Sequence, residues 1–143
     1  MLNKMKITFS SISQNEAFAR NVIASFMLSL NPTLSELNEV KTAVSEAVTN
    51  AIVHGYPDSV GEITMEATID GDNLHIIIKD CGVGIENINQ ALEPFYSTKF
   101  NEERSGMGFT VMQSFMDEVD VVSTLNVGTT IVMNKRLTKQ KTA

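Results

Sequence analysis

Glu46 and Asn50 are the residues whose types and spacing first suggest chemistry. They lie four positions apart in the stretch Glu-Ala-Val-Thr-Asn-Ala-Ile-Val-His-Gly, residues 46–55, which has the pattern of the end of a long helix. On a helix such residues project from one face, while the apolar stripe around Val44 falls on the opposite side. A carboxylate and a carboxamide would therefore stand together where a reaction could use them. Taken alone, such a pair is most simply interpreted as an ordinary solvated helix face.

Two glycine motifs suggest a phosphate site. Gly106 and Gly108 directly precede an apolar run, residues 109–116, that predicts a helix. Free backbone N–H groups and the positive end of the helix dipole at such a start favour a phosphate. Asp80-x-Gly82-x-Gly84 leaves a predicted strand, and a tight turn is its simplest interpretation. The GxxxxGK[ST] loop and the strand–GxGxxG–helix context are both absent, which leaves an unusual kind of phosphate site.

Periodicity predicts the elements that must position these residues. Apolar and polar residues alternate as in strands at 4–10 and 61–70. The more apolar residues 74–79 predict a buried strand that pairs with 61–70 as a hairpin, and residues 119–124 and 129–137 predict two strands joined by a turn. Helical spacing predicts one helix that begins after Ser13 and ends before Asn31, and a longer one from about Thr33 to Gly55. Both start with a capping-box pattern, Ser13 with Glu16 and Thr33 with Glu36. The polar, irregular residues 85–104 predict a lid or binding loop.

The order of these elements predicts the fold class. A strand, two helices, a hairpin, a loop, a helix and a second hairpin favour one α+β domain over residues 1–143. We expect a two-layer sandwich in which helices cover one face of a mixed, mainly antiparallel sheet. The other face carries Thr64, Glu66 and Thr68, and it should be wet or partly used by a partner.

Composition narrows the functional classes. The net charge is −6, and the only basic cluster is a short C-terminal tail, which argues against direct binding to duplex DNA. The single cysteine, Cys81, excludes a disulfide framework and suits a reducing cytoplasm. No apolar run approaches the roughly 20 residues of a membrane span, and the first residues have no secretory pattern. We therefore expect a cytoplasmic protein without a membrane anchor. His75 is interpreted as a strand-surface residue, not a metal ligand.

The order of the motifs resembles a known superfamily. It is similar to the N, G1, G2 and G3 boxes of the GHKL ATPases, which have the Bergerat ATP-binding fold and include gyrase-type topoisomerases, heat-shock chaperones and histidine kinases. The matching residues span about 40–132 and are Glu46-x-x-x-Asn50 with His54-Gly55, Asp80-x-Gly82-x-Gly84, Gly106-x-Gly108 and Gly128-Thr129-Thr130.

A closer resemblance is to the anti-sigma serine kinases of spore-forming bacteria. It is carried by residues 45–52, by Ser97-Thr98-Lys99 in the lid, and by Glu103-Arg104-Ser105-Gly106-Met107-Gly108. The sporulation branch matches best, and the stress-response branch remains an alternative. The resemblance implies a homodimer that holds a sigma F-like sigma factor inactive and phosphorylates a serine of an anti-anti-sigma protein. Arg20 becomes a candidate contact for both partners.

The resemblance also assigns roles around ATP. Asp80 would accept a hydrogen bond from the adenine amino group, Gly82 and Gly84 would let the backbone approach closely, and Thr130 would close the adenine side. Other residues would contact the phosphates or their loop: Thr98, Lys99, Arg104, Ser105, Gly106, Met107 and Gly108.

The catalytic roles follow in the same way. Asn50 would hold Mg²⁺, and Glu46 would act as the general base towards the incoming serine hydroxyl, or would position it. Two further alternatives remain. One is a binding module that uses ATP only to set its shape. The other is the ATP-binding domain of a sensor histidine kinase, against which stands the lack of a preceding helical pair with a phosphoacceptor histidine.

Overall fold

The computed structural model describes residues 2–85 and 108–138. The elements follow the predicted order, with bounds within a few residues of those expected. They are β1 (Leu2–Ser10), α1 (Gln14–Phe26), η1 (Met27–Leu30), α2 (Leu34–Asn50), η2 (Ala51–Gly55), β2 (Glu62–Asp70), β3 (Asn73–Asp80), α4 (Gly108–Phe115), β4 (Glu118–Thr124) and β5 (Gly128–Arg136).

The strands form one sheet in the order β1-β2-β3-β5-β4. Every pairing in it is antiparallel, so the expected mainly antiparallel sheet is confirmed, and no parallel pairing occurs within the described residues. Its register places Asp80, at the end of β3, between Ile63 of β2 and Thr129 of β5. The last residue of β3 is thus held by a strand on each side.

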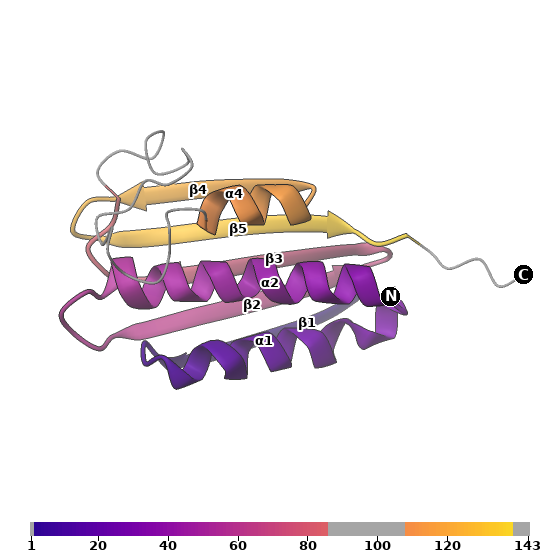
Figure 1. Ribbon diagram of the computed structural model, residues 1–143, viewed down its shortest axis with the longest axis horizontal. Coiled ribbons are helices and arrows are strands. Elements are labelled where there is room, and N and C mark those ends of the chain that lie inside the picture. The colour runs from indigo at the N-terminus through magenta and orange to yellow at the C-terminus, as the bar shows by residue number, and fades with distance from the viewer. Residues whose placement is uncertain (1, 86–107, 139–143) are drawn as a thin grey trace, which may run out of the picture.

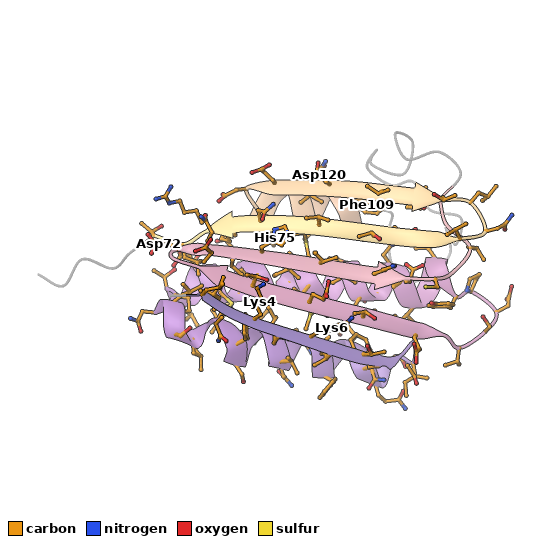
Figure 2. The ribbon with its side chains drawn as sticks, turned by 180° about the vertical axis from the view of Figure 1, so that it is seen from behind. Lys4, Lys6, Asp72, His75, Phe109 and Asp120 are labelled. Carbon is orange, nitrogen blue, oxygen red and sulfur yellow. The ribbon has the colours of Figure 1, made fainter. Side chains whose placement is uncertain are left out.

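The helices α1, α2 and α4 cover one face of the sheet, which confirms the two-layer arrangement (Figure 1). Alternation along the strands supplies the core, since Ile63, Met65, Ala67 and Ile69 are all buried against the helical layer. None of the described helices covers the opposite face. Figure 2 shows Lys4, Lys6, His75 and Asp120 on it, as the polar half of the alternation predicts.

The start of α2 has the predicted capping box. The Thr33 hydroxyl accepts the Glu36 N–H at 3.0 Å, and the Glu36 carboxylate accepts the Thr33 N–H at 2.9 Å. The capping box predicted at Ser13 is wrong. Ser13 already has helical dihedral angles (φ −60°, ψ −31°), so its hydroxyl makes no cap hydrogen bond. Glu16 pairs instead with Arg20, with 3.2 Å between Oε2 and Nε.

The end of α2 changes its winding before the chain leaves the helix. Residues Ala51–Gly55 form a π-helical turn, closed by the Tyr56 N–H donating to the Ala51 carbonyl at 3.1 Å. The helical stretch thus ends at Gly55, as expected. Such turns often occur at functional sites. None of the helices within the described ranges is long and apolar enough to cross a membrane.

Candidate nucleotide-binding site

The motif residues that the structure describes gather at one end of the sheet. The C-terminal part of α2, the end of β3, the β4–β5 turn and the start of α4 all meet there (Figure 1). A Cβ atom on Gly108 would lie 3.9 Å from the Glu46 carboxylate, so the first residue of α4 faces the carboxylate of α2. The structure therefore brings Glu46 close to Gly108, the one residue of the Gly106-x-Gly108 motif that it describes.

Glu46 and Asn50 lie on the less buried side of α2. Both are half-buried, whereas Ala47, Val48 and Thr49 between them are buried. The helix thus presents the carboxylate and the carboxamide on one face and packs its other face into the core. Thr49 lies on the core side, with 7% of its surface exposed.

Asp80 is the most deeply buried carboxylate among the described residues, with 4% of its surface exposed. Its Oδ1 accepts the Gly82 N–H at 2.9 Å. Burial raises the pKa of this carboxyl above its ordinary value, and hydrogen bonds from the backbone amides of Gly82 and Thr129 offset only part of that effect. A carboxylate has about four acceptor sites, so it retains capacity for the N–H of a ligand.

The two glycines after Asp80 are required by neighbouring protein backbone. A Cβ atom on Gly82 would lie 2.0 Å from the Gly55 carbonyl oxygen. Gly84 has a φ of +78°, and its Cβ would lie 2.3 Å from the Thr124 carbonyl oxygen. The family resemblance assigns these glycines to close approach of the backbone to the nucleotide. The fold itself already requires them, because the turn packs against the backbone of η2 on one side and of the β4–β5 hairpin on the other.

The threonine beside Asp80 is Thr129, and the prediction for Thr130 is wrong in position. Asp80 pairs with Thr129 across the sheet, while Thr130 pairs with Lys79. Because side chains alternate between faces, Thr129 shares the face of Asp80, and Thr130 projects from the uncovered face. Thr129 is 3% exposed, and its Oγ1 lies 2.8 Å from Ser123 Oγ. Cross-strand register, which sequence alone does not give, was the missing signal.

Several predicted site residues lie outside the described residues: Thr98, Lys99, Arg104, Ser105, Gly106 and Met107. Arg20 is described. It lies on α1, and 40% of its side-chain surface is exposed beside Glu16. Within residues 2–85 and 108–138, no group of three or more His, Cys, Asp or Glu side chains could hold a metal ion. Asn50 would therefore need oxygen ligands from a bound nucleotide and water to hold Mg²⁺.

A hollow also lies on the uncovered sheet face, away from the motifs. The residues that line it include Glu66 and also Lys4, Lys6 and His75, which are labelled in Figure 2. His75 Nδ1 is hydrogen-bonded to Asn134 Oδ1, which agrees with its interpretation as a strand-surface residue. Of the predicted ATP-site residues that the structure describes, none lines this hollow.

Comparisons with known proteins match almost the whole chain. The family model described as histidine kinase-like ATPase domain matches residues 10–135. The anti-sigma F factor of Anoxybacillus flavithermus is 53% identical over 99% of this chain and 97% of its own length. The anti-sigma F factor of Clostridium kluyveri is 56% identical over 93% of this chain and 94% of its own.

Solved structures show the same fold at low sequence identity. The RsbU and RsbW domains of Rv1364c from Mycobacterium tuberculosis match with a TM-score of 0.69 and 21% identity, over 94% of this chain and 32% of that one. The catalytic domain of the histidine kinase ThkA matches with a TM-score of 0.58 and 12% identity, over 93% of this chain and 96% of that one. The fold expected from the sequence is confirmed.

Proposed function

The chain belongs to the histidine kinase-like ATPase domain family and, within it, to the anti-sigma F factors, and from this premise we propose that it is an ATP-dependent protein serine kinase. In this proposal it holds a sigma F-like sigma factor inactive and phosphorylates a serine of an anti-anti-sigma protein. The observation that carries the proposal is the meeting of buried Asp80, Glu46 and the start of α4 at one end of the sheet.

Adenine recognition falls to Asp80. Its carboxylate accepts a hydrogen bond from the exocyclic amino group of adenine, a position at which guanine carries a carbonyl oxygen. With guanine, its carbonyl oxygen would face the Asp80 carboxylate, so two acceptors would meet without a donor. This is costly in a buried site, where polar groups need a hydrogen-bond partner. The turn amide of Gly82 fixes one carboxylate oxygen, which supports a preset orientation. Thr129, adjacent on the same face, replaces Thr130 as the hydroxyl on the adenine side.

The phosphates lie between α2 and α4 in this proposal. Gly108, with Ser105, Gly106 and Met107 before it, offers backbone N–H groups at a helix start. Asn50 contributes its carbonyl oxygen to Mg²⁺, and Thr98, Lys99 and Arg104 contact the phosphates from the lid, residues 86–104. Neutralisation of phosphate charge and alignment are the main requirements of phosphoryl transfer. Residues 1–143 act as one ATP-binding domain.

Glu46 acts on the incoming serine. The serine oxygen forms a bond to the γ-phosphorus while the bond to the ADP oxygen breaks, and the hydroxyl proton passes to the Glu46 carboxylate. The position of this carboxylate, 3.9 Å from where a Cβ on Gly108 would be, supports a role beside the phosphates. The same carboxylate orients the hydroxyl before transfer.

The partners meet a different surface. Arg20 on α1 is the proposed contact for the sigma factor and the anti-anti-sigma protein. Large apolar side chains are exposed on and just before this helix, since Phe18 is 49% and Ile12 39% exposed. Exposed aromatic and arginine side chains are the common anchors of protein interfaces. In this proposal the active form is a homodimer in the cytoplasm. It binds the sigma factor there and transfers phosphate from ATP to the anti-anti-sigma protein.

Phosphoryl transfer from labelled ATP tests the proposal directly. The protein is mixed with Mg²⁺, γ-labelled ATP and each candidate anti-anti-sigma protein, and phosphoserine is measured. Glu46→Gln should slow transfer by about 100- to 10,000-fold because the proton acceptor is lost. ADP binding should persist in this variant. Glu39→Gln is the matched control, because Glu39 lies on the same helix but pairs with Lys135 at 3.6 Å.

Each result decides between the alternatives. Absence of transfer by the unaltered protein to either candidate would overturn the kinase proposal and leave a module that binds ATP and the sigma factor without phosphorylating a partner. If Glu46→Gln transferred phosphate at the normal rate, the assignment of Glu46 as the general base would be wrong, but the kinase proposal would stand. If phosphate were transferred only to the anti-anti-sigma protein of the stress-response branch, that branch would replace the sporulation branch in the proposed function.

A further inference from the structure

The turn after Asp80 is fixed by three successive backbone amides, each with its own acceptor. The Cys81 N–H donates to Tyr56 Oη at 2.7 Å, the Gly82 N–H to Asp80 Oδ1 at 2.9 Å, and the Val83 N–H to the Gly55 carbonyl at 2.8 Å. Two of these acceptors belong to Gly55, the last residue of the π-helical turn that follows Asn50, and to Tyr56, the next residue. The chain that ends the Asn50 helix therefore holds the turn that carries Asp80.

Tyr56 joins this turn to the start of β2 through a single hydroxyl. The hydroxyl accepts the Cys81 N–H and donates to the Glu62 carbonyl at 2.7 Å, so both of its roles are used. The aromatic ring fits because position 61 is a glycine, where a Cβ would lie 2.2 Å from a ring carbon. The phenol is partly buried, and burial raises its pKa above the ordinary value, so it remains protonated and able to donate at neutral pH.

We propose that Tyr56 is a positioning residue that sets the base specificity of the ATP site by holding the Asp80 turn in one conformation. This inference rests on the proposed function, in which Asp80 reads the adenine amino group. Tyr56 does not touch the nucleotide in this scheme; it acts through the Cys81 amide. No motif used for ATP binding assigns a role to this hydroxyl.

The physical reason is the directionality of a single hydrogen bond. A carboxylate distinguishes an amino group from a carbonyl only while its oxygen stays at the right distance and angle, within about 0.5 Å and 10–20° for a preorganised site. Without the phenol oxygen, the Cys81 N–H and the Glu62 carbonyl would each lose a partner and turn towards water. The turn would then admit several Asp80 orientations, and some of them would tolerate guanine.

Tyr56→Phe tests the inference, with ADP and GDP as probes so that no turnover occurs. Dissociation constants for both are measured by calorimetry on the full chain. We expect ADP to bind about tenfold more weakly while GDP binding changes little, so that the preference for ADP over GDP falls by a similar factor. With ATP and a phosphorylatable partner, KM should rise and kcat should stay close to that of the unaltered protein.

Ser11→Ala is the matched control. The buried Ser11 hydroxyl accepts the Gly61 N–H at 2.9 Å, so the substitution removes a hydrogen bond from the other end of the same loop without touching the Asp80 turn. It should lower stability and leave the ADP-to-GDP ratio unchanged. If Tyr56 had a purely structural role, Tyr56→Phe would weaken ADP and GDP binding equally and would also leave the ADP-to-GDP ratio unchanged. This result would overturn the inference.

Two further results keep the test decisive. If Tyr56→Phe does not fold, fluorotyrosine at position 56 keeps the ring and hydroxyl but weakens the oxygen as an acceptor, and it should shift the ratio in the same direction. An unshifted ratio in a folded variant overturns the inference. Absence of any ADP preference in the unaltered protein would instead count against Asp80 as the adenine reader, and so against the proposed function itself.

Discussion

The two ends of the sheet each hold a buried carboxylate, and their pKa values shift in opposite directions. Glu36, at the start of α2, is 8% exposed, and Asp80, at the end of β3, is 4% exposed. Burial raises the pKa of Glu36, but hydrogen bonds from the amides of Thr33 and Thr138 outweigh it, and the net pKa is lowered. For Asp80, burial outweighs the amides of Gly82 and Thr129, and the pKa is raised.

This difference separates a residue that stabilises the fold from the residue that we propose binds adenine. Glu36 closes the capping box and also accepts the Thr138 N–H at 2.8 Å, which joins the first turn of α2 to the chain that leaves β5. Its ionised form is the favoured form in the folded protein. For Asp80, the amides of Gly82 and Thr129 offset only part of the cost of burying its charge, and in the proposed function the adenine amino group supplies a further donor. Shifts of the second kind are typical of functional sites.

Asp80→Asn should give the largest change. The variant loses the charged acceptor for the adenine amino group and presents an amide that can also donate, so ADP should bind about 10- to 100-fold more weakly. The empty protein should be as stable as the unaltered one at pH 7, or more stable. Because the folded pKa of Asp80 is raised above the ordinary 3.8, stability falls as pH rises from that value through the folded pKa, and ionised Asp80 therefore lowers stability at pH 7.

Calorimetric titration with ADP and urea unfolding at pH 7 check both parts of this prediction. A variant that binds ADP as the unaltered protein does would end the assignment of adenine to Asp80. A variant with weaker binding and a much lower free energy of unfolding would make Asp80 resemble Glu36, and the contrast between the two ends of the sheet would disappear.

Glu36→Gln should have the opposite profile. One amide oxygen replaces two carboxylate oxygens, and the side-chain NH2 faces a backbone donor, so the free energy of unfolding should fall by about 1–3 kcal/mol at pH 7. ADP binding should be unchanged. Because the folded pKa is below the ordinary 4.5, the ionised carboxylate stabilises the protein above that pH, and this contribution is lost as pH falls towards the folded value.

Urea unfolding at a series of pH values tests whether the stabilising contribution of Glu36 is lost as the pH falls. The gap between Glu36→Gln and the unaltered protein should be widest near neutral pH and should close as Glu36 is protonated. A gap that stays constant from neutral to acid pH would show that packing, and not the charge of Glu36, makes the contribution. Thr33→Ala, which removes only the other half of the capping box, provides a comparison that does not titrate.

The same contrast explains what the sequence could predict. The start of α2 was predicted correctly because its capping box involves residues three positions apart. The Ser13 pattern failed because Glu16 pairs with Arg20 and the helical geometry already includes Ser13. At the other end, the contacts of Tyr56 with Cys81 and Glu62 depend on how separate segments meet, so local pattern does not reveal them.

Thr129 and Thr130 show this limit most clearly, since the Gly128-Thr129-Thr130 motif offers two hydroxyls and only sheet register decides between them. Thr129→Val should weaken ADP binding about 3- to 10-fold, as expected for a neutral hydrogen bond, whereas Thr129→Ser should retain most of it. Thr130→Val, on the uncovered face, should bind ADP normally. If Thr130→Val alone lost affinity, β5 would have to pair with β3 one residue out of this register, and the original assignment of Thr130 would return.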